Sequence, residues 1–126
     1  MVLLIVVLGV FASEYHAMNQ RITQTYKFDW AVQSIAIFLK HNNGNSPRNW
    51  DDLREPFRNS SESGACPWTF DEIRSSVQVN FNTALTLDGS EPFVSATEVN
   101  DQYIHTRNDE LRNIARVLKN LERNSN

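Results

Sequence analysis

Residues 28 to 39 read Phe-Asp-Trp-Ala-Val-Gln-Ser-Ile-Ala-Ile-Phe-Leu, and their apolar positions recur every three or four residues. These positions are Phe28, Ala31, Val32, Ile35, Phe38 and Leu39. On an α-helix this spacing gathers the side chains into one stripe, which is typical of a helix that packs against a core. Asn42-Asn43-Gly44 follows and tolerates the left-handed conformation that ends helices, while Pro47 opposes a restart. The stretch therefore predicts a core-facing helix that ends at this turn.

An unbroken apolar run opens the chain from Met1 to Ala12. A helix of this length measures about 17 Å, whereas the hydrocarbon core of a bilayer is roughly 30 Å thick. No Pro or Gly lies between Ser13 and Phe28, so one helix can continue from the run into the stripe, although Asp29 could also cap a separate segment. We predict an uncleaved membrane anchor made of Val2, Leu3, Leu4, Ile5, Val6, Val7, Leu8, Val10 and Phe11.

A cleaved leader is the alternative for the same run. Val10-Phe11-Ala12 before Ser13 has small residues at the two positions that a signal peptidase reads. Cleavage after Ala12 would release a secreted small domain that binds a ligand or acts as an enzyme. In either case we expect most of the chain to lie outside the cytoplasm.

Short helices are predicted after the turn. Asn49 is a candidate N-cap for a helix over residues 50–53, which Pro56 would end, and residues 58–64 are predicted to form a surface loop. Thr69-Phe70-Asp71-Glu72 has the form of a capping box, which predicts one or two helical turns over residues 70–75.

A small antiparallel sheet is predicted next. Val77, Val79 and Phe81 alternate with polar residues, which is the period of a strand with one face on a core, and Leu85 and Leu87 continue the alternation. Asp88-Gly89 is a tight-turn signal, so residues 93–96 are expected to return as the partner strand.

The chain closes with an amphipathic pattern. Its apolar positions are Leu111, Ile114, Ala115, Leu118 and Leu121. They lie on one stripe and predict a C-terminal helix. The predicted fold is α+β, with a membrane anchor and juxtamembrane helix over residues 1–27 and a small soluble domain over residues 28–126.

Composition limits the function. The 126 residues suit one compact domain, and the net charge of −3 argues against nucleic acid as a partner. Cys66 is the only cysteine, so no disulfide within the chain can form. No cofactor is predicted.

Candidate chemical groups are few. His16, His41 and His105 lack the spacing of metal ligands. Glu98, Asp101, His105 and Asp109 form one cluster that could offer oxygen ligands to a hard cation, but we interpret it as a solvated linker before the last helix. Asp51 and Asp52 point about 100° apart on a helix, which favours capping over acid–base chemistry. We predict no catalytic, cofactor-binding or metal residue.

Several short pieces of the sequence carry a family resemblance. Val6 to Ser13, together with Ile35 to Leu39, Asn43-Gly44 and Pro47, resembles the type IV pilin and type II secretion pseudopilin superfamily. Chains of that superfamily carry a Glu a few residues into the apolar helix, whereas no acidic residue precedes Ser13 here. The order Asn43-Gly44, Pro47 and Trp50 to Leu53 is also similar to a group of small membrane-anchored bacterial proteins of unassigned function.

The resemblance implies an assembly role. In the superfamily the first part of the helix anchors the subunit and packs inside a filament, and the second part lies beneath the sheet. We therefore expect a non-catalytic structural or interaction protein of the cell envelope. Its expected partners are membrane lipid and other envelope or pilin-like subunits.

Overall fold

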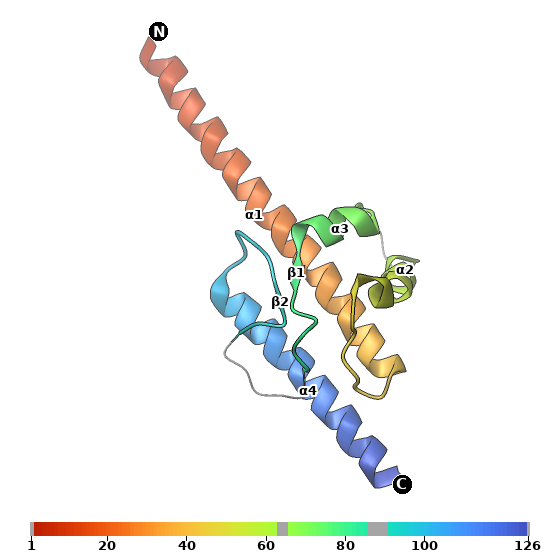
Figure 1. Ribbon diagram of the computed structural model, residues 1–126. Helices are drawn as coiled ribbons and strands as arrows, with labels where there is room; N and C mark the ends of the chain where they lie inside the picture. The colour runs from red at the N-terminus through yellow and green to blue at the C-terminus, as the bar shows by residue number, and fades with distance from the viewer. Residues whose placement is uncertain (1, 63–65, 86–90, 126) are drawn as a thin grey trace.

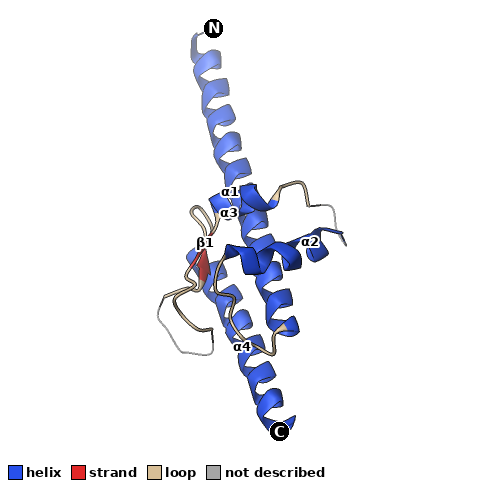
Figure 2. Ribbon diagram, turned by 45° about the vertical axis from the view of Figure 1, so that its right-hand side comes forward, coloured by secondary structure: helices blue, strands red, loops and turns tan. Residues whose placement is uncertain are grey.

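The computed structural model describes residues 2–62, 66–85 and 91–125. Its elements are α1 (Val2–His41), the 3₁₀ turn η1 (Trp50–Leu53), α2 (Arg54–Glu62), α3 (Phe70–Ser76), β1 (Gln78–Val79), β2 (Val94–Ser95) and α4 (Asp101–Ser125). The N-terminal part of α1 stands clear of all other elements, and α4 extends past the opposite end of the molecule (Figure 1 and Figure 2). The α+β fold class is confirmed, with helices as the main component.

The α1 helix is continuous over 40 residues, which corresponds to about 60 Å. Asp29 therefore caps no separate helix. The predicted stripe lies in the core, where Phe28, Ile35 and Leu39 have no exposed surface. Asn43 and Gly44 adopt φ values of 55° and 83°, and the Gly44 N–H donates to the Leu39 carbonyl at 2.9 Å. The predicted helix end is thus confirmed.

The sheet is an antiparallel pair in which Gln78 lies opposite Ser95 and Val79 opposite Val94. It is shorter than predicted, because the chain turns at once after β1. The Asn80 N–H still donates to the Phe93 carbonyl, at 2.7 Å, but the Asn80 carbonyl accepts from the Thr83 N–H at 3.3 Å, which closes a turn. Leu87 and the predicted Asp88-Gly89 turn lie outside the described residues.

The predicted stop at Pro56 is wrong, since α2 continues to Glu62. Pro56 is the third residue of α2, close to the helix start, where a missing N–H is well tolerated. Residues 58–62 are helical rather than part of a surface loop, and Ser60 is buried with its hydroxyl donating to the Phe57 carbonyl at 3.0 Å.

The C-terminal helix is confirmed, but α4 begins ten residues before Leu111. The Asn100 side-chain oxygen caps it, accepting from the N–H groups of Gln102 and Tyr103 at 2.9 and 3.2 Å. The linker predicted to carry Glu98, Asp101, His105 and Asp109 is therefore wrong for the last three residues, which belong to α4. The α4 helix lies beside the second half of α1 and runs in the same direction, as Figure 1 shows.

The predicted membrane anchor is also wrong. Among residues 2–62, 66–85 and 91–125, no helix combines the length and the apolar character needed to cross a membrane. The apolar run ends at Ala12, after which α1 continues through polar residues such as Glu14, Asn19 and Arg21. This finding contradicts the single-pass anchor at Val2 to Phe11 and the membrane localisation inferred from it.

Candidate functional site

One face of α1 carries exposed apolar side chains outside the core. Met18, Ile22 and Tyr26 are 52%, 46% and 56% exposed. Further along the same helix, Gln33 and Lys40 are also exposed. We call these five residues the open stripe. Its first three members are spaced four residues apart and so lie above one another on adjacent turns.

A groove runs between α1 and α4 near the end of the open stripe. Its volume is about 490 Å³, and it is lined by Lys40, Glu110, Asn113, Ile114, Val117 and Leu118. The last three of these form an apolar floor, and Val117 is 54% exposed. We call this cavity the α1–α4 groove. It is an apolar helix surface that its own domain covers only in part, since Ile114 and Leu118 are partly buried against the core.

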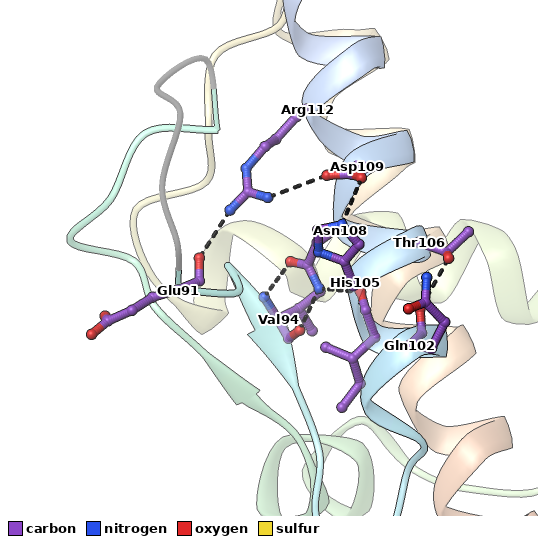
Figure 3. Close-up of polar contacts among 9 residues, drawn as sticks. Glu91, Val94, Gln102, His105, Thr106, Asn108, Asp109 and Arg112 are labelled. Atoms are coloured by element: carbon purple, nitrogen blue, oxygen red, sulfur yellow. Dashed lines mark hydrogen bonds and ion pairs between the residues drawn. The ribbon is translucent and has the colours of Figure 1, made fainter.

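A second groove, of about 460 Å³, lies between the β2 region and α4. Figure 3 shows how its polar side chains are held. The buried Asn108 side chain accepts from the Val94 N–H at 2.9 Å and donates to the carbonyls of Val94 and Ile104 at 2.8 and 2.7 Å. It therefore occupies the outer edge of β2 as a neighbouring strand would.

Arg112 completes this arrangement from the same side of α4. Its guanidinium donates to the Glu91 carbonyl at 2.9 Å and lies 3.6 Å from an Asp109 carboxylate oxygen (Figure 3). A buried guanidinium needs such partners, because a charge taken out of water without them is costly. Asn108 and Arg112 thus fasten the β2 segment to α4, which is a structural task.

The cluster predicted from Glu98, Asp101, His105 and Asp109 forms only in part. The His105 Nε2 atom lies 3.2 Å from an Asp109 oxygen, and Asp101 and His105 line the second groove. Glu98 belongs to the preceding turn, with a φ of 65°. Within the described residues, no three His, Cys, Asp or Glu side chains gather closely enough to hold a metal ion.

The other candidate groups have structural partners. The Asp52 carboxylate accepts from the Arg48 N–H at 2.8 Å, and Asp51 pairs with Arg54 at 3.5 Å. The Cys66 thiol is half-buried and donates to the Trp68 carbonyl at 3.4 Å.

Three aromatic side chains that follow α1, at positions 50, 57 and 68, belong to the core or pack against it. Phe57 is buried, and Trp50 and Trp68 are partly buried against the core. Aromatic rings adjoin one another edge-on or tilted, as Trp50 does with Phe70 at 6.0 Å between ring centroids. These three side chains therefore form part of the packed interior and not an exposed aromatic binding surface.

A polar contact joins α1 and α4 near the start of α4. The Tyr103 hydroxyl donates to an Asp29 carboxylate oxygen at 2.5 Å, and the Arg107 Nε atom lies 3.5 Å from the same oxygen. Burial and this hydrogen bond raise the pKa of Tyr103 to about 12, from an ordinary value of 10.0. The protonated phenol is therefore the form that the fold stabilises.

This shift predicts a loss of stability at alkaline pH. Because Tyr103 keeps its proton in the folded state up to about pH 12, whereas an unfolded tyrosine loses it near pH 10.0, its contribution is complete below pH 10 and is lost between pH 10 and 12. Urea unfolding from pH 8 to 12 measures this. The stability difference between the parent and Tyr103→Phe should shrink across that window, and a difference independent of pH would contradict the assignment.

Sequence reasoning missed the open stripe and Asn108. The open stripe could have been found in the sequence, since Met18, Ile22 and Tyr26 recur at four-residue intervals. It was missed because the apolar run before it was interpreted as a membrane anchor. Asn108 had none, because an Asn in a helix gives no sign of the strand that it will meet. The residues predicted as an anchor form the projecting start of α1.

The chain was also compared with known proteins. No protein-family model, no curated protein and no solved structure matches it.

Proposed function

We propose that this protein is a non-catalytic structural or interaction subunit that assembles with other protein chains through α1. The observation that carries the proposal is the open stripe. Among the described side chains of α1, the buried positions begin at Phe28, while Met18, Ile22 and Tyr26, which precede it, each expose about half of a large apolar surface. Contiguous exposed apolar surface on a folded domain marks an interaction site.

The sequence of the projecting part supports the same role. Residues 2–12 of α1 are apolar throughout, so the helix start, like the open stripe, gains free energy when another surface covers it. An isolated helix is marginal in water, and a packing partner is the usual source of its stability. The architecture also suits a pseudopilin-like subunit, in which one helix lies beneath a small domain with one part and packs against other subunits with the rest.

A non-catalytic role is supported by the state of the polar side chains. In the groove between the β2 region and α4, Asn108 and Arg112 are occupied by groups of the chain itself. His105 adjoins Asp109, an arrangement that holds the two side chains in place on α4. The apolar surfaces, in contrast, remain uncovered.

A charge on the open stripe tests the proposal. Ile22→Lys places an ammonium group on the stripe and should abolish assemblies larger than the monomer, because burying that charge without a partner is unfavourable. Sedimentation velocity on the full chain over a range of concentrations measures assembly. Gln20→Lys is the matched control, since Gln20 is exposed, two residues away and on the opposite side of the helix.

Circular dichroism and thermal unfolding establish that both variants keep the fold, which is expected at exposed positions. Assemblies that survive Ile22→Lys as well as Gln20→Lys would contradict the proposal. A parent chain that stays monomeric at every concentration, alone and with its co-purified partners, would contradict it too.

A further inference from the structure

We propose that two copies of this chain pair through α1 in an antiparallel arrangement, about a two-fold axis at Ile22. Residues 2–12 of each copy then lie in the α1–α4 groove of the other. The inference rests on the proposed function, because it names the partner and the geometry for the same helix. It joins two surfaces that the domain covers only in part, the open stripe and the α1–α4 groove.

The first argument is the helical period. Eighteen residues make about five full turns of an α-helix, so positions 4, 22 and 40 lie along one line on the same side of α1. Positions 4 and 40 are each about 27 Å from Ile22, in opposite directions. A two-fold axis at Ile22 therefore brings position 4 of one copy beside Lys40 of the other.

The second argument is that this side of α1 is open at five positions. Asp29 lies on the same side, seven residues after Ile22, and is contacted by Tyr103 and Arg107 of α4, so the open surface passes Asp29 on the side away from that helix. Met18, Ile22 and Tyr26 are exposed, and so are Gln33 and Lys40 further along. The side chains of the predicted core stripe point away from it into the domain. An antiparallel helix can therefore follow the open stripe from Met18 to Lys40, passing Asp29 on the side away from α4, without displacing a core residue.

The third argument is the chemical match at Lys40. The α1–α4 groove offers an apolar floor of Ile114, Val117 and Leu118, with one basic and one acidic residue, Lys40 and Glu110, at its rim. Residues 2–12 carry no charged side chain, so they can pack on the apolar floor of the groove. The charged groups of the two rim residues can stay in contact with water. The long stem of Lys40 can pack on the incoming helix while its ammonium group stays solvated.

The length of the segment also matches the groove. Residues 2–12 span about 15 Å as a helix, and the α4 positions from Glu110 to Leu118, which border the groove, span about 12 Å. Because α1 and α4 run in the same direction, the incoming helix is antiparallel to both, and its dipole opposes theirs favourably.

A parallel pairing satisfies fewer of these constraints. It places position 4 beside position 4 of the partner and leaves the floor of the α1–α4 groove, including the exposed Val117, in water. The antiparallel pairing covers the open stripes of the two copies with each other. It also covers the α1–α4 groove of each copy. It is isologous and closed, so it predicts a dimer with no further growth.

Cysteine cross-linking on the full chain tests the geometry, in a Cys66→Ser background. Ile22→Cys should link to itself, because position 22 lies on the axis. Leu4→Cys and Lys40→Cys should form no link separately and should link to each other when the two variants are mixed. Gln20→Cys is the control on the opposite side of α1, and we expect its linked fraction to be roughly tenfold lower than that of Ile22→Cys, because only paired positions reach a high effective concentration.

The outcomes separate this inference from the proposed function. A dimer by light scattering with 22–22 and 4–40 links supports both. A link of Leu4→Cys with itself, or assemblies larger than a dimer that require Ile22, overturns the antiparallel pairing and leaves assembly through α1 intact. A parent chain that is monomeric at all concentrations, with no links above the Gln20→Cys control, overturns both.

Discussion

Replacing Asn108 by Asp is expected to destabilise the domain by about 3–5 kcal/mol at neutral pH. The carboxylate can still accept from the Val94 N–H, but it cannot donate to the carbonyls of Val94 and Ile104, which Asn108 reaches at 2.8 and 2.7 Å. It also places a negative charge at a position that is 1% exposed. Urea unfolding, followed by circular dichroism, measures the loss.

Asn120→Asp is the matched control for this substitution. Asn120 lies on the same helix but is exposed and outside the α1–α4 groove, so the identical chemical change should alter stability by no more than about 0.5 kcal/mol. Protonation of the new carboxyl restores a donor, and the loss caused by Asn108→Asp should therefore be smaller at pH 4 than at pH 7. Equal effects at the two positions would show that Asn108 does not hold β2 against α4.

Replacing Gly44 by Ala is expected to cost about 3 kcal/mol. Gly44 has a φ of 83°, which alanine adopts only with strain. An added Cβ would also meet the Ala115 carbonyl oxygen at 2.5 Å and the Leu118 Cβ at 3.2 Å. Because these atoms belong to α4, relief of the overlap requires the turn after α1 to move away from that helix.

Asn43→Ala separates the two causes. Asn43 has a φ of 55° and is exposed, so its replacement carries the backbone strain at a position outside the packed interior and should cost about 1 kcal/mol. The difference between the two variants in urea unfolding measures the close approach of the turn to α4. If both variants lose the same free energy, the approach contributes nothing.

Features that depend on neighbours in the chain were predictable. The stripe from Phe28 to Leu39 and the end of the helix at Gly44 follow from local periodicity and from glycine's freedom at positive φ. The capping box formed as predicted, with the Glu72 N–H donating to the Thr69 hydroxyl at 3.2 Å and the Thr69 N–H to the Glu72 carboxylate at 3.1 Å. The partners in these contacts lie within five residues of each other in the sequence.

Features that depend on distant partners were not predictable. The alternation through Phe81 and Leu85 read as one strand, but Leu85 donates its N–H to the Ser46 hydroxyl at 2.9 Å and is buried outside the sheet. The apolar start of the chain read as a membrane anchor, because its composition suits lipid as well as it suits another helix. Composition shows that a segment is apolar, but it does not determine whether lipid or another helix covers that segment.

The candidate site divides in the same way. The amino-acid order alone makes α4 and the part of α1 from Phe28 to Leu39 amphipathic, since the free energy of each turn depends on residues three and four apart. Which side of α1 stays uncovered is decided only when α4 docks beside it and Tyr103 and Arg107 meet Asp29. That docking joins residues more than seventy positions apart, and it creates both the open stripe and the groove at Lys40, because an exposed surface is defined by what the rest of the fold fails to cover.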